Sequence, residues 1–372
     1  MRFSTKLVPV FAVVIMLFNS CKNELNILAP YRETVSVYAI LDPTQNRNYI
    51  RINRIFLGEG DAFVMATVQD STNYGPGILR VTLTRTFGGL VAGTTIGDPL
   101  KTEIVLSDTV IQLKSGPFNT NQRLWFTNDK LYTDGEYTLK IQNTKTGNEF
   151  TSTCSMIGPI LTPGIIQPLG PKYYPVAYSP TNIPSDYLDL SSPTAPRSVT
   201  FYSLPKARDY SCIIRMHYVD YCNISGTDSI KQTIDYEFSR ISSTNLDGGE
   251  KLAFTYTSAN YFNFIYLELT KKGNPPNFLK RRLEYIEYIL TNATQEYADF
   301  IKVNAPSTSI AQDKPTYSNI SNGGYGIFSC RANFYAPKHP HANTYDYLAT
   351  TAPYCNLVFM KSDGTVFAGT CN

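Results

Sequence analysis

The chain has 372 residues, of which 33 are basic and 30 acidic, so its formal net charge is only +3 at pH 7. Because the two signs are nearly balanced and neither forms a long block, the sequence argues against the concentrated basic surface that binds nucleic acids. The chain contains 27 Tyr and 20 Phe but a single Trp. This aromatic content favours the half-buried faces of β-sheets and predicts a mainly β protein.

The N-terminus has the pattern of a cleaved export signal. Arg2 and Lys6 precede an apolar run over residues 8–18, which is shorter than the roughly 20 residues that a membrane-spanning helix needs. No later apolar run approaches that length. We therefore expect residues 1–20 to be removed as a signal peptide.

Cys21 directly follows this signal, and a cysteine in that position is typical of a bacterial lipoprotein, whose lipid is attached to the sulfur. We expect Cys21 to be lipidated and residues 21–30 to form a tether to the membrane. The alternative is an ordinary secreted chain that is cut near Ser20, with Cys21 left as a free or paired thiol.

Short stretches of alternating apolar and polar residues recur over residues 31–161. In one of them Ile50 and Ile52 share one face while Arg51 takes the other, which marks a half-buried strand. The clearest hairpin joins residues 137–141 to 150–154. Further strands are predicted at 34–41, 79–85, 103–106 and 122–127, and a long loop at 58–73. Several short strands separated by turns fit an immunoglobulin-like β-sandwich.

Residues 162–197 contain eight prolines and show almost no periodicity, so they are predicted to be a linker. A second, β-rich domain is predicted over residues 198–372. Its expected strands are 199–203, 212–221, 231–239 and 283–290, followed by a terminal hairpin over 356–368.

One or two short helices are predicted in the second domain. The first begins at Ser258, carries Tyr261, Ile265 and Leu269 on one side and ends at Gly273. The second begins near residues 292–295, where the sequence resembles a capping box.

Seven cysteines become six once Cys21 is assigned to the lipid, and the six are Cys154, Cys212, Cys222, Cys330, Cys355 and Cys371. An even number in an oxidising compartment favours disulfides, and buried free thiols are the alternative. Cys212 and Cys222 bracket a predicted strand of about 33 Å, whereas bridged Cα atoms lie within about 7 Å, so this pair is disfavoured. Cys355 and Cys371 flank the predicted terminal hairpin, and we expect them to form a disulfide, although Cys330 competes for either partner.

Catalytic motifs of the metalloprotease, nucleophile-elbow and phosphate-loop types do not occur in the chain. His339 and His341 lie in a predicted loop where both could face one metal ion, but no third ligand is identifiable. Asp235 and Glu237 lie about 7 Å apart on one strand face, a spacing compatible with glycoside hydrolysis, yet solvated strand faces carry such pairs routinely. His217 is interpreted as a surface or interface residue. The sequence therefore predicts no catalytic residues, no metal site and no cofactor.

Four segments together resemble a known family: residues 37–42, 49–58, 317–323 and 326–329. They are similar to uncharacterised envelope lipoproteins of Bacteroidota, of the DUF4249-like kind. Such proteins begin with a lipidated cysteine, continue into an N-terminal β-sandwich and carry an Asn-Ile-x-Asn-Gly and Gly-x-Phe signature near the C-terminus. The family has no established activity, so the resemblance implies architecture and location alone. Cys330 departs from the pattern expected after Ser329.

These observations predict a lipid-anchored protein of the outer membrane or cell surface. We expect it to contact the membrane through its lipid, to bind no nucleic acid, and to act as a non-enzymatic binding or accessory module for an envelope protein or an extracellular polymer. The alternative is a secreted hydrolase with an active site built from loops. An acid, a base and a nucleophile in one deep pocket favour the enzyme, whereas a flat, aromatic or loop-rich surface favours binding.

Overall fold

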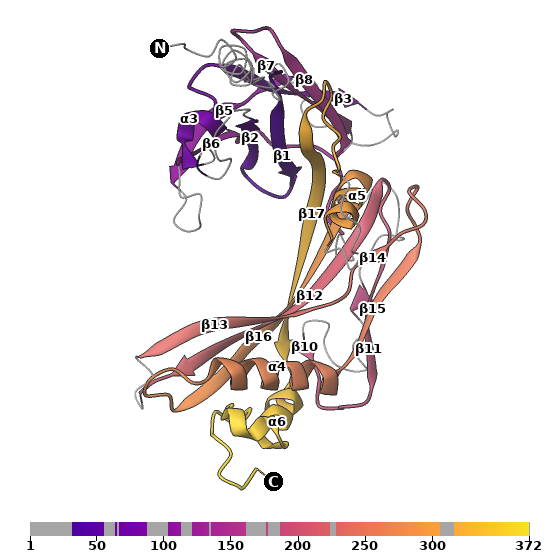
Figure 1. Cartoon of the computed structure of the whole chain (residues 1–372). Coiled ribbons are helices and arrows are strands. Elements are labelled where there is room, and N and C mark those ends of the chain that lie inside the picture. The colour runs from indigo at the N-terminus through magenta and orange to yellow at the C-terminus, as the bar shows by residue number, and fades with distance from the viewer. Residues whose placement is uncertain are drawn as a thin grey trace, which may run out of the picture.

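The structure is a computed structural model that describes residues 32–55, 64, 67–87, 103–112, 121–133, 135–160, 176–177, 187–223, 228–305 and 316–371. Within these residues the protein is mainly β, with several sheets and few helices, as the sequence predicts. Figure 1 shows an upper lobe, built largely from the N-terminal strands, and a long lower lobe that ends at the C-terminus. The predicted signal peptide, Cys21 and the tether lie outside the described residues.

The upper lobe has a sandwich-like arrangement of two sheets (Figure 1). One sheet contains β1 (Val35–Leu41), β2 (Asn48–Arg54), β6 (Asn121–Thr127) and β5 (Ser107–Gln112), and the other contains β4 (Glu103–Val105), β3 (Leu79–Phe87), β7 (Gly135–Asn143) and β8 (Glu149–Ser155). The chain changes sheet between β4 and β5 at Leu106, whose amide donates to the carbonyl of Val81. Apolar side chains of both sheets fill the core between them.

Alternation predicted most of these strands. Ile50 and Ile52 are buried and Arg51 is exposed, and the hairpin of β7 and β8 pairs Ile141 with Phe150. Strand β5 was not predicted because its side chains are almost all exposed and give no alternation. The predicted loop at 58–73 lies partly outside the described residues and contains a short helix, α3 (Gln69–Thr72).

Strand β17 (Tyr325–Pro340) joins the two lobes. Its first part pairs in parallel with β1, from Ser36 opposite Tyr325 to Leu41 opposite Cys330. Its second part pairs antiparallel with β16 (Lys280–Thr294) in the lower lobe. The resulting ten-stranded sheet is continuous through both lobes. The prediction of a loop around His339 is wrong, because His339 lies on β17. The predicted domain boundary at 162–197 stays a prediction.

The lower lobe continues this sheet through β12 (Ala207–Tyr221) to the edge strand β13 (Ser229–Glu237), with β10 (Tyr187–Leu188) beside β17 and β14 (Ile241–Ser242) beside β12. A small second sheet contains β15 (Lys251–Thr257), β11 (Pro196–Tyr202) and β9 (Val176–Ala177). Helix α4 (Ser258–Lys272) runs along one face of the large sheet, and α5 (Gln295–Asn304) lies where the lobes meet (Figure 1).

Helix α4 forms because its apolar residues repeat at helical spacing. Tyr261, Ile265 and Leu269 are buried, as the sequence predicts. The N-cap is Thr257 rather than Ser258, since the Thr257 hydroxyl accepts the amide of Asn260 at 3.2 Å.

The described residues contain more helices than the one or two expected. Helix α6 (Ala342–Thr350) and the 3₁₀ turn η2 (Tyr354–Leu357) follow β17 near the C-terminus. The predicted terminal hairpin is wrong in its first half, because residues 354–357 form η2 and the chain then makes a single antiparallel bridge between Met360 and Val366. The segment nevertheless returns, so that Cys355 and Cys371 are bonded with their Cα atoms 5.7 Å apart. The remaining described cysteines, Cys154, Cys212, Cys222 and Cys330, are buried free thiols.

Candidate functional site: an open sheet face

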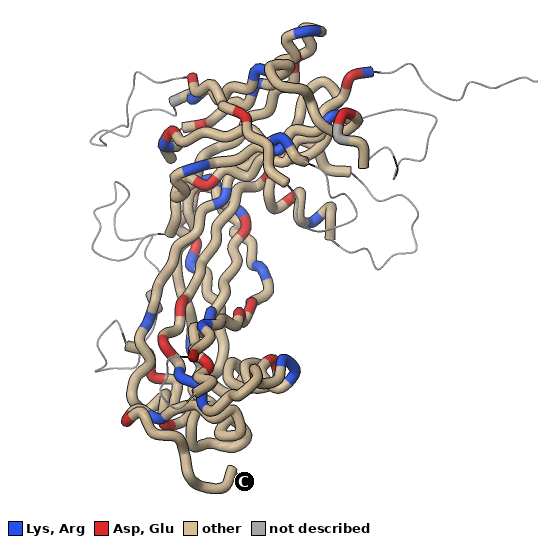
Figure 2. Tube along the Cα trace, turned by 90° about the vertical axis from the view of Figure 1, so that its left-hand side faces the viewer, with Lys and Arg blue, Asp and Glu red and all other residues tan. Residues whose placement is uncertain are grey.

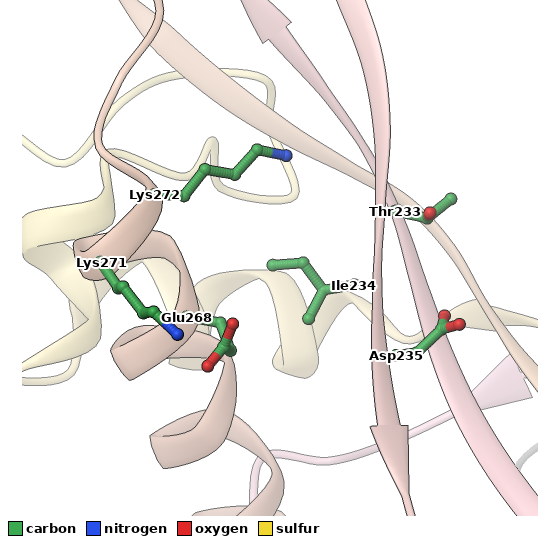
Figure 3. Close-up of a pocket in the computed structure, with 6 residues that line it drawn as sticks. All are labelled: Thr233, Ile234, Asp235, Glu268, Lys271 and Lys272. Carbon is green, nitrogen blue, oxygen red and sulfur yellow. The ribbon is translucent and has the colours of Figure 1, made fainter. Parts of the chain in front are cut away.

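A pocket of about 490 Å³ lies between β13 and the end of α4. It is lined by Thr233, Ile234, Asp235, Glu268, Lys271 and Lys272. Figure 3 shows Ile234 pointing toward the helix, while Thr233 and Asp235 point away from it. The Asp235 carboxylate instead accepts two hydrogen bonds of 2.7 Å from Arg215. The side chains that α4 presents to the pocket are therefore two lysines and one glutamate.

The two loop histidines of the sequence do not meet at a metal site. His339 lies on β17, with its ring centroid 6.0 Å from that of Tyr187. His341 is the N-cap of α6, where its Nδ1 accepts the amide of Asn343 at 3.3 Å. Across the part of the chain that the structure describes, no three His, Cys, Asp or Glu side chains gather closely enough to hold a metal ion.

Within the described residues, the large sheet of the lower lobe has one face packed against α4 and a second face that is less covered. Ile214 and Met216 of β12 are buried on the covered side, where Ile234 of β13 points toward α4 (Figure 3). Alternate residues of a strand point to opposite faces, so Arg215 and His217 lie on the other side. This second face carries aromatic and charged side chains from five strands, β10, β12, β13, β16 and β17.

Cross-strand register places these side chains in rows. His217 of β12 lies opposite Tyr285 of β16, and Tyr187 of β10 lies opposite His339 of β17. Because Ile286 pairs with Lys338, the next antiparallel position brings Tyr285 opposite His339. Four rings therefore cross the sheet in one line, which spans about 14 Å at the usual strand spacing.

A second row lies beside the first; its first three members are charged, and its fourth is a proline that also belongs to the exposed edge. Asp235, Arg215, Glu287 and Pro337 are opposite one another on β13, β12, β16 and β17. Beyond it, Ile289 pairs with Tyr335. We call the surface that carries the ring row, the charged row and Tyr335 the ring face.

The inner rings of the ring face are locked by their neighbours. The rings of His217 and Tyr285 stack at a centroid distance of 4.0 Å and an angle of 14°. His217 Nε2 lies 3.3 Å from the Glu287 carboxylate. Burial, followed by the negative charges of Glu287 and Glu284, raises the pKa of Tyr285, so its hydroxyl stays protonated at neutral pH.

The outer rings are accessible to solvent. Tyr335 is 48% exposed and Tyr187 is 44% exposed, and Pro337 and His339 between them are exposed as well. Together they make an apolar strip along β17 and β10, with the charged row on its flank. The hydrogen bonds from Arg215 to Asp235 raise the pKa of the guanidinium, and the nearby Glu287 adds to this effect.

The sequence signature near the C-terminus has a structural role. Asn319 holds the loop before β17 in place, because its amide donates to the carbonyl of Phe328 at 2.7 Å and its oxygen accepts the Phe328 amide at 2.9 Å. Gly326 has a positive φ of 110°, and a Cβ there would overlap the carbonyl oxygen of Val37 in β1. The signature therefore fits the close approach of β17 to β1 and lies away from the ring face.

No family model and no curated protein matches this chain. In the described part of the molecule, no helix is both long enough and apolar enough to cross a membrane. Sequence reasoning identified His217 as a surface or interface residue and considered Asp235 and His339, but it missed Tyr187, Tyr285 and Tyr335. For Tyr335 the available signal was the period-two alternation over residues 331–339, where every second residue is polar, aromatic or proline.

Proposed function

We propose that this protein is anchored by a lipid on Cys21 at the outer membrane or cell surface, where it binds an envelope protein or an extracellular polymer without catalysing a reaction. The observation that carries the proposal is the ring face, which is rich in aromatic rings and whose outer tyrosines, Tyr187 and Tyr335, are 44% and 48% exposed. We also propose that the upper lobe is of the immunoglobulin-like type and that the protein is related to Bacteroidota envelope lipoproteins.

The direction of the chain supports this arrangement. Strand β17 runs parallel to β1 and ends in the lower lobe, so β1 begins at the end of the upper lobe that points away from the lower lobe. A tether that joins the chain before β1 would then enter the upper lobe at the end far from the lower lobe. The ring face would project from the membrane, as a binding module requires.

A secreted hydrolase is the second candidate, and one observation favours it. His217 lies between Glu287, at 3.3 Å, and Thr233, its partner in the register of β12 and β13. A base between a carboxylate and a hydroxyl resembles a catalytic arrangement. In the part of the chain that the structure describes, however, these groups lie side by side on a sheet face and outside the pocket beside α4, apart from Thr233, so binding is the better supported function.

The test has an anchoring arm and a catalytic arm. Wild-type protein should partition into the detergent phase, whereas Cys21→Ala should appear in the aqueous phase with an unchanged circular dichroism spectrum. Equal partitioning of the two proteins would refute the lipid anchor. The catalytic arm measures reducing ends released from polysaccharides. If the wild-type protein releases them and His217→Gln does not, the protein is a hydrolase and the non-enzymatic function is wrong.

A further inference from the structure

We infer that the ring face binds a neutral polysaccharide, an inference that rests on the proposed binding function and names its ligand. The two accessible tyrosines set the size of the ligand. Tyr335 lies four residues before His339 on β17, and Tyr187 lies one strand beyond His339. Strand geometry therefore separates Tyr335 from Tyr187 by about 14 Å. A ligand that contacts both must be an extended chain of several units.

The apolar strip fits the faces of sugar rings. One face of a pyranose presents C–H groups, which pack against the electron-rich faces of aromatic rings. Tyr187 and Tyr335 are about half exposed, and the exposed Pro337 between them adds a flat apolar surface. The stacked pair of His217 and Tyr285 stays in place beside the strip. This part of the surface is therefore formed before the ligand arrives, which lowers the entropic cost of binding.

The charged row supplies the partners that sugar hydroxyls need. The Asp235 and Glu287 carboxylates accept hydrogen bonds, and the Arg215 guanidinium donates them. Side chains of Arg215 and Asp235 are 32% and 30% exposed, so their outer atoms remain available to a ligand at the surface.

The charges on the ring face argue for a neutral polymer. Arg215 is held by Asp235 through two hydrogen bonds, so its charge is already balanced. Glu287 contributes a further negative charge beside it. The net charge of Arg215, Asp235 and Glu287 is negative, which disfavours a phosphate-rich or uronic polymer. Figure 2 shows basic and acidic residues interspersed along both lobes, as expected for a protein that does not select its ligand by charge.

The test is affinity electrophoresis in gels that contain hydroxyethylcellulose, laminarin, mannan or amylopectin, with alginate as the anionic comparison. The full-length Cys21→Ala chain should be retarded by at least one neutral polymer and not by alginate. The double variant Tyr187→Ala/Tyr335→Ala should bind about tenfold more weakly or worse, since it loses two ring contacts.

The control variant is matched in exposure. Tyr49 and Tyr325 are 44% and 48% exposed, as Tyr187 and Tyr335 are, but they lie in the upper lobe, and Tyr325 begins the same strand that carries Tyr335. Tyr49→Ala/Tyr325→Ala should therefore bind like the parent. Equal weakening of both double variants, undiminished binding by the ring-face variant, or preference for alginate would overturn the inference.

Failure of this inference is distinguishable from failure of the proposed function. If none of the neutral polymers retards the protein while a photo-crosslinker at position 187 captures one envelope protein in cells, the polysaccharide is wrong and the binding module stands. If Cys21→Ala partitions like wild type, the anchored function falls whatever the gels show. Circular dichroism of every variant confirms that loss of binding is not loss of folding.

Discussion

Arg281 and its partner Asp220 are the most deeply buried charged residues of the described lower lobe. Each has 1% of its side chain exposed. Its Nε donates to the Asp220 carboxylate at 2.6 Å, its Nη1 to the carbonyl of Leu357 at 3.3 Å and its Nη2 to the side chain of Asn274 at 3.2 Å. The guanidinium also lies 4.8 Å from the ring centroid of Phe278. One side chain thus connects β12, β16 and the C-terminal segment.

We predict that Arg281→Met destabilises the protein by about 3–5 kcal/mol, because it leaves the Asp220 carboxylate buried without its counter-charge. The amide of Gln232, 2.9 Å from the other carboxylate oxygen, is neutral and cannot replace that charge. Arg281→Lys keeps the charge but loses the fork of donors, so its stability should lie between those of the wild type and Arg281→Met. Arg281→Met/Asp220→Asn should recover part of the loss, since no charge remains buried.

Urea unfolding followed by far-ultraviolet circular dichroism measures these differences in the Cys21→Ala background. A suitable control is Arg80→Met, because Arg80 and Glu103 form a surface pair whose side chains are 53% and 46% exposed, and such pairs contribute about 0–1 kcal/mol. An Arg281→Met midpoint equal to that of Arg80→Met would show that the reasoning from burial is wrong. The reasoning would also be wrong if Arg281→Met/Asp220→Asn were less stable than Arg281→Met alone.

Three further predictions concern the joints of the fold. Gly326→Ala should destabilise the protein by at least about 2 kcal/mol through backbone strain and overlap with β1. Gly323→Ala should cost less, because Gly323 has a positive φ but open space around its Cα. Urea unfolding midpoints of the two variants test this difference. Non-reducing peptide mapping should recover Cys355 and Cys371 in one linkage, and separate linkages would contradict the structure. Cleavage at a protease site introduced within residues 162–186 should leave both fragments together in size-exclusion chromatography, because β17 pairs with β1; separated fragments would exclude that pairing.

Local patterns were enough to predict the elements whose burial alternates regularly. Ile50 and Ile52 marked β2, and Tyr261, Ile265 and Leu269 marked α4, because each set lies on one buried face. The sequence did not predict strand β17 as a whole, because it contains Gly326 and Pro337, which usually interrupt strands. Its partner β1 lies almost 300 residues away in the sequence, so no local signal compensates for them.

The ring face was beyond sequence reasoning because it exists only through register. Tyr187, His217, Tyr285 and His339 come from four strands, and a shift of one residue in any of them would turn its ring to the other side of the sheet. The predicted carboxylate pair illustrates the same point, since Asp235 is engaged by Arg215 across the strand rather than by Glu237 along it.

The continuous sheet also determines how the ring face is held relative to an anchor. A covalent linker alone leaves two lobes free to reorient, because few contacts restrain them. Here the backbone hydrogen bonds of β17 connect β1 to β16, and a strand of 16 residues extends over about 50 Å. The sheet would therefore hold the ring face in one direction relative to the β1 end of the upper lobe. Such rigidity suits the proposed binding of an extended polymer, because the loss of orientational freedom between the lobes then occurs on folding and not on binding.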